Sequence, residues 1–194
     1  MMRGEHVTTF NPQPKRLRFS VDDYYRMIDL GILDSREKAE IIDGELIKKM
    51  TIADRHAAAV NWLTRFFITN VSENILVSIQ NPLRLGDYDE PEPDIVLADL
   101  TKYDGKRHPR PAETILVIEV SDSTLKYDRE IKIPLYAEAE IPEVWIVNLP
   151  NRIVEIHHQP TVGIYQFAKI FKQGEIVKSF VLPDLALEVD SILS

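Results

Sequence analysis

Two carboxylates stand at the ends of apolar segments, where a strand would take them out of water. Glu119 lies near the end of residues 114–120, which are apolar at both alternating positions, and Asp94 follows Pro93 and leads residues 95–98. Because neither side of the first segment is polar, both of its faces should be covered. A buried carboxylate is costly unless a cation or several donors compensate it. The two residues are therefore candidates for one site.

A divalent cation would make such a pair of carboxylates favourable. If neighbouring strands bring Asp94 and Glu119 together, their repulsion calls for a counter-ion. Mg²⁺ binds one or two carboxylates together with water and phosphate oxygens, and Mn²⁺ accepts the same ligands. Glu40, which opens the apolar pair 41–42, is a third carboxylate of this kind. Taken singly, Asp94 and Glu119 are equally compatible with a strand-end carboxylate that reaches solvent or caps a helix, and for Glu40 alone this structural interpretation is favoured.

Lys132 is the candidate cation of the chain itself. Asp128, Lys132 and Tyr136 follow at i, i+4 and i+8, so they share one face of a helix. This helix follows the Glu119 segment closely enough to fold back beside its end, where an ammonium could orient water and offset charge on a phosphate oxygen. The alternative is a surface Asp128–Lys132 pair worth about 0.3–0.5 kcal/mol. Lys132 is not predicted in the core, so Lys132→Ala should leave thermal stability nearly unchanged.

Histidines offer weaker signals. His56 lies near the start of an expected helix and on its apolar face. A partly buried core histidine is the structural interpretation, and a donor or phosphate contact near a helix N-terminus is the functional one. His157 and His158 are adjacent in a strand pattern, so they point to opposite faces and cannot chelate one ion together.

Strand and helix patterns alternate along the chain and must position these groups. The sequence predicts, in order, a helix over 21–30 capped by Ser20, a hairpin over 39–47 around Asp43-Gly44, a helix over 54–72 opened by a capping box at Thr51, strands over 75–79, 82–85, 94–98 and 114–120, a helix over 125–138 interrupted or restarted at Pro134, and strands over 143–147, 152–157 and 165–171. This order predicts a mixed α/β (α+β) fold with one sheet and three helices. Residues 1–18 are expected to form a loose arm, and residues 19–194 a single domain.

Composition excludes several classes of protein. The chain has 194 residues, of which 44% are hydrophobic and 28% charged, as in globular domains. Twenty-three Lys and Arg against thirty-one Asp and Glu give a net charge of −8, which excludes a general basic coat for nucleic acid. The basic residues Lys102, Lys106, Arg107, His108 and Arg110 are expected in an exposed loop, which would supply a positive track if it flanked the acidic cluster. Zero cysteines exclude disulfides, thiol catalysis and cysteine metal sites.

Several motifs are missing from the sequence. It contains no Gly-x-Ser-x-Gly, Walker or Gly-x-Gly-x-x-Gly motif, which weakens serine-hydrolase and nucleotide-motor interpretations. No signal-peptide pattern or long apolar run is present, so we expect a cytoplasmic protein without a membrane segment. Trp145, between Val144 and Ile146, is expected in the core.

The ordered blocks resemble a known family. Pro93-Asp94 and Glu119-Val120-Ser121 resemble the bipartite signature of the PD-(D/E)xK nuclease superfamily. More narrowly, the chain resembles the Uma-type restriction endonucleases through Glu40-Ile41-Ile42-Asp43-Gly44-Glu45-Leu46, His56, Glu90-Pro91-Glu92-Pro93-Asp94-Ile95, Leu116-Val117-Ile118-Glu119-Val120, and residues 128–148 with Lys132 and Tyr136. The resemblance covers about residues 20–190.

The resemblance implies a restriction endonuclease-like fold, in which helices flank a central mixed β-sheet. It implies that Asp94, Glu119 and the backbone of Val120 bind Mg²⁺ or Mn²⁺, and that Glu40 completes the acidic site. The superfamily pattern places a lysine two residues after the glutamate, where this chain has Ser121. Similar families carry the lysine on the following helix, which corresponds to Lys132.

The leading hypothesis is a metal-dependent endonuclease that hydrolyses phosphodiester bonds in DNA. Glu40, Asp94, Glu119 and Lys132 are its catalytic candidates, with His56 and Tyr136 as supporting or substrate-contacting residues. DNA is favoured over RNA as the partner, and a homodimer would suit cleavage of both strands of a duplex. The alternative is a catalytically inactive nuclease-fold module that binds nucleic acid or a protein, which the acidic net charge and Ser121 favour. A metal hydrolase for another substrate is a third, weaker hypothesis.

Overall fold

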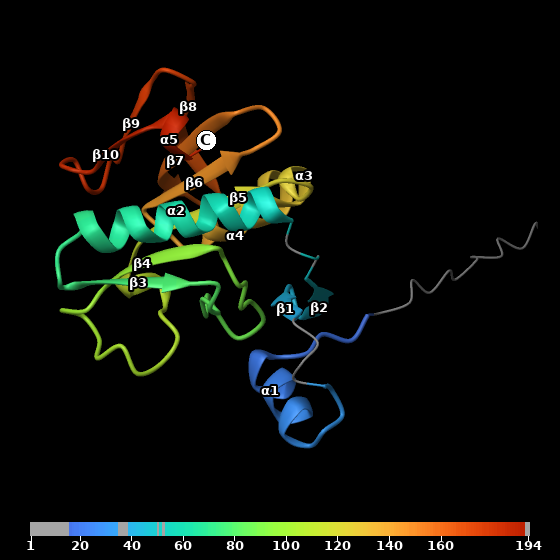
Figure 1. Ribbon diagram of the computed structural model, residues 1–194. Helices are drawn as coiled ribbons and strands as arrows, with labels where there is room; N and C mark the ends of the chain where they lie inside the picture. The colour runs from blue at the N-terminus through green and yellow to red at the C-terminus, as the bar shows by residue number, and fades with distance from the viewer. Residues whose placement is uncertain (1–15, 35–38, 50, 52, 193–194) are drawn as a thin grey trace, which may run out of the picture.

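Six strands form a mixed sheet at the centre of the molecule (Figure 1). The computed structural model describes residues 16–34, 39–49, 51 and 53–192. The strands lie in the order β3 (Ile75–Ile79), β4 (Ile95–Asp99), β5 (Thr114–Ser121), β6 (Glu143–Asn148), β7 (Ile153–Thr161) and β8 (Ile164–Lys172). Strands β5 and β6 run parallel, and the other neighbouring pairs are antiparallel. The predicted mixed sheet is thus confirmed.

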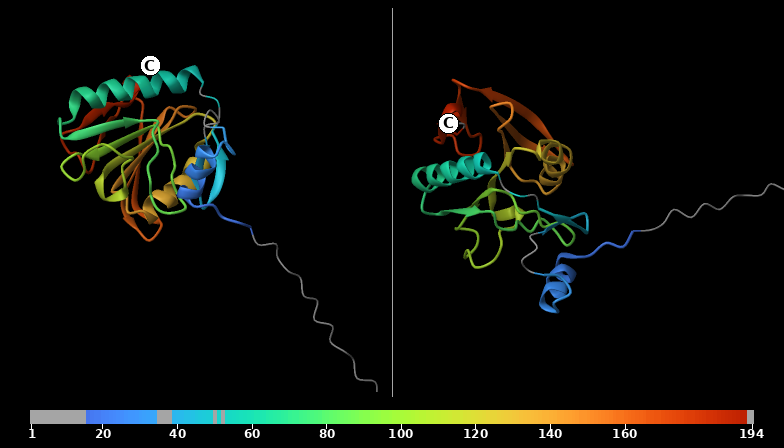
Figure 2. Two further views of the ribbon diagram at one scale, coloured as in Figure 1. Left: turned by 90° about the horizontal axis from the view of Figure 1, so that it is seen from below. Right: turned by 45° about the vertical axis from the view of Figure 1, so that its right-hand side comes forward.

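Helices cover both faces of this sheet (Figure 2). Helix α2 (Asp54–Asn70) packs Leu63 and Phe67 against β5 and β6, in a cluster that includes Trp145. On the other face, α4 (Ile133–Glu138) packs Tyr136 in a second cluster. Strand β5 is therefore buried on both sides, as its apolar sequence predicts. No helix in the described parts of the chain is long and apolar enough to cross a membrane.

The N-terminal elements sit beside the sheet. Helix α1 (Val21–Asp29) begins after Ser20, whose side chain accepts the N–H of Asp23, which confirms the predicted cap. Strands β1 (Ala39–Ile42) and β2 (Glu45–Lys48) form the predicted hairpin, and Asp43 and Gly44 take φ values of 52° and 72° in its turn. Such left-handed conformations explain why an Asp-Gly pair occupies this turn.

Two predictions about the middle of the chain are wrong. Residues 82–85 form no strand, although the backbone N–H of Leu83 donates to the carbonyl of Pro91 and that of Leu85 to the carbonyl of Asp89. Proline has no N–H, so Pro91 cannot return a bond and a regular ladder does not form. The expected capping box at Thr51 is absent as well, because α2 begins after Ala53 without a side-chain cap.

The helical segment between β5 and β6 is interrupted, as predicted, but the interruption begins before Pro134. It consists of α3 (Leu125–Tyr127), a π-helical turn (Asp128–Lys132) and α4. Within it the N–H of Ile133 bonds to the carbonyl of Asp128, five residues back. The interruption lies upstream of Pro134, which fits into the first turn of α4. Such single π turns occur frequently at functional sites.

The C-terminal residues form small elements that the sequence patterns do not predict. Strands β9 (Ile176–Lys178) and β10 (Ala186–Glu188) pair with each other, and the short helix α5 (Val189–Ile192) follows; a 3-10 turn (Pro111–Glu113) precedes β5. These pieces are too short to show a periodicity, and Val177 and Leu187 find their place by packing on the α2 side of the sheet.

The predicted N-terminal arm falls mainly on residues 1–15, outside the described residues. Of its last three residues, Arg16 bonds to the carboxylate of Glu45 and Arg18 to the carbonyl of Asp43. The chain thus runs along the β1–β2 hairpin before α1 begins.

Candidate active site

The sheet register brings Asp94 and Glu119 together. Ile95 of β4 lies opposite Ile118 of the antiparallel β5, so one residue further along Asp94 lies opposite Glu119. Opposite residues of an antiparallel pair project from the same face. The N–H of Val120 donates to Oδ2 of Asp94 at 2.8 Å and ties the two strands at this point. Both carboxylates are buried, with 8% and 4% of their surface exposed.

Hydrogen-bond donors surround the carboxylate of Asp94. Nε2 of His56 lies 3.1 Å from Oδ2, and the side-chain amide of Gln80 donates to Oδ1 at 3.2 Å. Burial by itself would raise the pKa of Asp94, but the hydrogen bond and charge of His56 and the Val120 amide outweigh it, so this pKa is lowered. Conversely, burial would lower the pKa of His56, and Asp94 raises it. Asp94 is therefore held as an anion.

Glu119 lies in a contrasting environment. Nζ of Lys132 lies 3.1 Å from its Oε1, and the hydroxyl of Tyr136 donates to the same oxygen at 2.5 Å. Burial raises the pKa of Glu119 to about 8; Lys132 opposes this rise, while the charges of Asp128 and Asp94 add to it. Neighbouring carboxylates with pKa values shifted in opposite directions are typical of acid–base and metal sites.

Lys132 is buried between two carboxylates, with 6% of its surface exposed. Besides Glu119, it pairs with Oε2 of Glu40 at 3.3 Å. Burial by itself would lower the pKa of Lys132, but Glu119 and Glu40 raise it, so the side chain is an ammonium at neutral pH. The surface Asp128–Lys132 pair is therefore wrong, because both side chains are buried. The small expected effect of Lys132→Ala on stability rested on a side chain outside the core, so we now expect a larger effect. Helical spacing showed which residues share a face but not what covers that face.

The hairpin supplies the third carboxylate. Glu40 of β1 is buried, and its Oε2 also accepts the backbone N–H of Glu92 at 3.1 Å. Its Oε1 accepts the hydroxyl of Tyr127 at 3.2 Å. These bonds fix the hairpin carboxylate against both the loop that leads to Asp94 and the helical segment.

A fourth carboxylate, Asp128, lies behind this group. Its Oδ2 accepts the hydroxyls of Ser121 and Thr124, each at 2.7 Å. Ser121, at the position where the superfamily pattern has lysine, is fully buried and is not among the described residues that line the cavity. A lysine at this position of β5 would thus point into the helical segment, whereas Lys132 points from that segment toward the carboxylates.

Most of the candidate residues line one cavity. Its volume is about 560 Å³, and its walls include Glu40, His56, Asp94, Glu119, Val120 and Lys132. Tyr136 contributes through its bond to Glu119. Gln80 and Tyr127 also line the cavity and were not predicted. Gln80 could have been noticed, because it directly follows β3 at the end of the sheet where Asp94 precedes β4.

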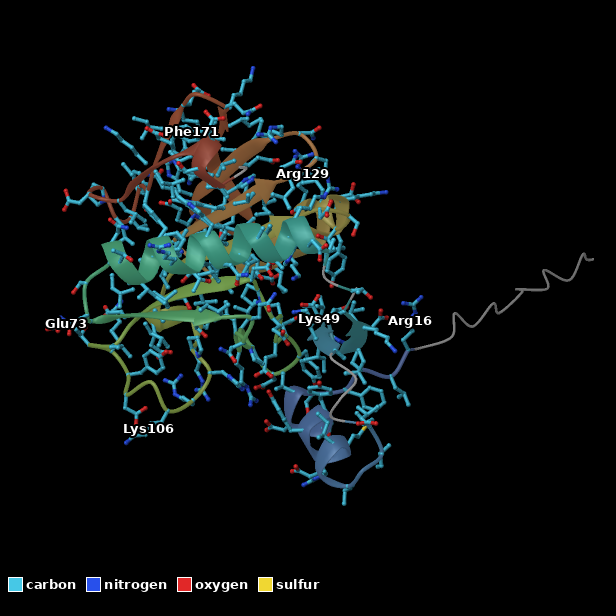
Figure 3. All side chains as sticks on the ribbon, viewed as in Figure 1. Arg16, Lys49, Glu73, Lys106, Arg129 and Phe171 are labelled. Atoms are coloured by element: carbon cyan, nitrogen blue, oxygen red, sulfur yellow. The ribbon has the colours of Figure 1, made fainter. Side chains whose placement is uncertain are left out.

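The basic loop lies elsewhere. Lys102, Lys106, Arg107, His108 and Arg110 are exposed, as predicted, but they connect the ends of β4 and β5 that are remote from Asp94 and Glu119. In Figure 3, Lys106 lies at the lower left of the molecule, well apart from Lys49, which lines the cavity. This loop therefore does not supply a positive track beside the acidic cluster.

The carboxylate oxygens at the cavity are of the type that binds a hard divalent cation. Among the described residues, no three His, Asp or Glu side chains form a ready metal-binding group. Instead, N–H and O–H donors hold Asp94 and Glu119. Mg²⁺ needs one or two carboxylates, since water and phosphate complete its shell. Burial is the main cause of the raised pKa of Glu119, and the nearby charges of Asp128 and Asp94, which a cation would offset, add to it.

Comparisons with known proteins bear on the family and the fold of the chain. The family model Uma2, described as "Putative restriction endonuclease", matches residues 21–190. Among solved structures, that of "a putative nuclease belonging to DUF820" from Anabaena variabilis has a TM-score of 0.69 and 15% sequence identity, covering 90% of this chain and 97% of that chain. At this identity the likeness shows a shared fold. No curated protein matches the sequence.

Proposed function

The chain belongs to the Uma2 family of putative restriction endonucleases, and from this premise we propose that it is a metal-dependent endonuclease that hydrolyses phosphodiester bonds of DNA. One observation carries the proposal: three carboxylates and a buried ammonium, from four separate segments of the chain, meet at one cavity. Acidic groups for a divalent ion beside a cation for phosphate oxygens form a suitable arrangement for phosphodiester hydrolysis.

Asp94 and Glu119, with the backbone carbonyl of Val120, would hold Mg²⁺ or Mn²⁺. When bound, such an ion supplies a Lewis acid for phosphate oxygens and lowers the pKa of coordinated water. Asp94 supports this role because His56 and Gln80 keep its carboxylate ionised and oriented.

Lys132 would act on the phosphate. Its ammonium, held by Glu119 and Glu40, places positive charge where negative charge grows on a phosphate oxygen. Glu40 positions this side chain, and Tyr136 positions Glu119 through its hydroxyl. Contacts between neighbouring elements thus hold these side chains in place.

Cleavage of plasmid DNA tests the proposal. Nicked or linear product should form with Mg²⁺, disappear with a chelator and return when Mg²⁺ is restored in excess. Asp94→Asn and Lys132→Met should lose the activity, whereas Lys106→Gln, a matched change in the remote basic loop, should retain it. A parallel assay on RNA of the same sequence tests the preference for DNA. Equal cleavage by Asp94→Asn and the unaltered protein would overturn the proposal.

A second candidate is a nuclease-fold module that binds without catalysis. Two observations favour it: Ser121 occupies the place of the superfamily lysine, and no ready group of three metal-binding side chains occurs among the described residues. A Mn²⁺ titration separates the candidates. A catalytic site should bind Mn²⁺ and lose this affinity in Asp94→Ala, whereas a binding module should show no dependence on Asp94.

A further inference from the structure

A second hollow lies on the other face of the sheet from Glu119. Its volume is about 430 Å³, and its lining includes His158 and Phe180 between strand β7 and the segment that follows β9. Ile156 and Phe171, which also line it, belong to the core cluster on the α2 side. Glu119 instead contacts Tyr136 of the opposite cluster. The hollow is therefore separate from the candidate active site.

Three nearly parallel rings lie at this hollow: His158 and Phe180 line it, and Phe167 stacks on His158 beside it. The ring of His158 stacks with Phe180 at a centroid distance of 4.3 Å and an interplanar angle of 15°. It also stacks with Phe167 at 5.2 Å and 10°. The two phenylalanines are 54% and 51% exposed, so the molecule presents stacked aromatic rings to solvent.

The exposed ring of Phe180 is carried on a fixed backbone. Its N–H donates to Oε2 of Glu143 at 2.7 Å, and the N–H of Val181 donates to the same oxygen at 2.9 Å. Glu143 is fully buried, and its other oxygen accepts the indole N–H of Trp145 at 2.5 Å. A buried carboxylate thus anchors an exposed aromatic residue, which lowers the entropy that a ligand must overcome on binding.

Positive charge accompanies these rings. Lys169 lies over the ring of Phe171, with Nζ 4.5 Å from its centroid, and Lys178 lines the same hollow. No carboxylate occurs among the described residues that line it, although the chain carries a net charge of −8. Strand β8, at the edge of the sheet, has two lysines and no acidic residue. If a second copy of the chain paired along β8, the lysines of the two copies would face each other without negative charges between them. An anionic partner is therefore better matched to this surface than a second copy.

We propose that this hollow binds a single-stranded nucleic acid, with bases stacked on Phe180 and Phe167 and phosphates beside Lys169 and Lys178. Exposed aromatic rings next to lysines are the usual means of holding single strands without sequence preference. Duplex DNA keeps its base faces covered and would lack the stacking contribution. The inference rests on the proposed function for the class of its ligand, and it adds a binding site outside the cavity.

Binding without cleavage tests this inference. A fluorescently labelled oligothymidylate of 20 nucleotides is titrated with the full chain in the presence of EDTA, and its anisotropy is followed at several salt concentrations. Phe180→Ala should weaken binding about tenfold. Lys169→Glu should weaken it more than Lys106→Glu, the matched charge reversal in the remote loop, and should reduce the salt dependence. A duplex of equal length should bind more weakly than the single strand.

Equal affinity of Phe180→Ala, Lys169→Glu and Lys106→Glu for the oligonucleotide would overturn the inference. So would a dimer of the unaltered protein that dissociates in Phe180→Ala during sedimentation, because a second copy would then cover the hollow. Thermal melting shows whether each variant is folded. If Phe180→Ala does not fold, the affinities of Lys169→Glu and Lys178→Glu for the oligonucleotide test the inference instead. Binding and cleavage are both assayed in Glu119→Gln and in the unaltered protein, which separates the two proposals. If the unaltered protein binds the oligonucleotide through Phe180 but cleaves no DNA, the proposed function fails and this inference stands alone.

Discussion

Nζ of Lys132 lies 3.1 Å from Oε1 of Glu119, and both side chains are more than nine-tenths buried. Desolvation makes such pairs a poor source of stability, yet removing one partner leaves the other charge buried and unpaired. The pair borders a cavity that Asp94 and Glu40 also line. Its position is thus better explained by chemistry at the cavity than by a need for stability.

Replacement of Lys132 should affect both activity and stability. Lys132→Met leaves Glu40 and Glu119 buried without their cation, so cleavage should be lost and the free energy of unfolding should fall by about 3–5 kcal/mol in alkaline solution. In acidic solution the loss should be smaller, because Glu119 has a pKa of about 8 even beside Lys132 and is protonated there. Since the folded protein holds this proton more tightly than the unfolded chain, stability should decrease as pH rises toward that pKa.

Urea unfolding at a series of pH values measures this effect. Lys126→Met is the matched control, since Lys126 lies on α3 and its side chain is 85% exposed. It should change stability little at any pH. Equal stability of Lys132→Met and the unaltered protein above the pKa of Glu119 would contradict the buried ion pair.

Metal binding should release a proton from Glu119. Because burial raises the pKa of this carboxyl to about 8, it is mostly protonated at neutral pH and must lose its proton to become a ligand. Mn²⁺ should therefore displace about one proton near neutral pH and progressively fewer as pH rises beyond the pKa. Calorimetric titrations in two buffers of different ionisation enthalpy count these protons. Glu119→Gln should abolish the release, and identical heats in both buffers for the unaltered protein would argue against Glu119 as a ligand.

His56 should support metal binding through Asp94. Its Nε2 lies 3.1 Å from the Asp94 carboxylate, which it orients and keeps ionised. His56→Ala should lower the affinity for Mn²⁺ by about 10–100-fold, in line with the loss of a residue that holds a metal ligand. His56→Gln keeps a side-chain donor and should recover part of this affinity. If both variants bind Mn²⁺ as the unaltered protein does, His56 is a core residue without a role at the site.

A lysine at position 121 should not replace Lys132. Ser121 is fully buried, and its hydroxyl donates to Asp128 at 2.7 Å, so Ser121→Lys would place a long cation where β5 meets the helical segment. The double variant Ser121→Lys/Lys132→Met should therefore be unstable and inactive. Ser121→Ala alone should cost about 1 kcal/mol of unfolding free energy, since Asp128 retains the hydroxyl of Thr124. A stable and active double variant would show that β5 can present the lysine to the cavity.

Local patterns predicted the elements that carry the site. The apolar residues at both alternating positions of 114–120, the Asp-Gly pair of the hairpin and the cap at Ser20 act over a few residues, and the structure confirms the elements they predict. The strand over 82–85 failed because its outcome depended on Pro91 of a neighbouring segment. The small C-terminal strands were missed for the related reason that packing on α2, rather than their own period, positions them.

By itself the sequence determined which carboxylates would be hard to bury and which helix would carry a lysine after β5, because residue type and spacing are local properties. Tertiary structure decided their partners. The β4–β5 register set Asp94 opposite Glu119, and the π turn placed Lys132 beside Glu40 of the hairpin. Gln80 and Tyr127 lie outside any motif and contact Asp94 and Glu40. Desolvation and charge pairing depend on what surrounds a side chain, and that is known once distant segments have packed together.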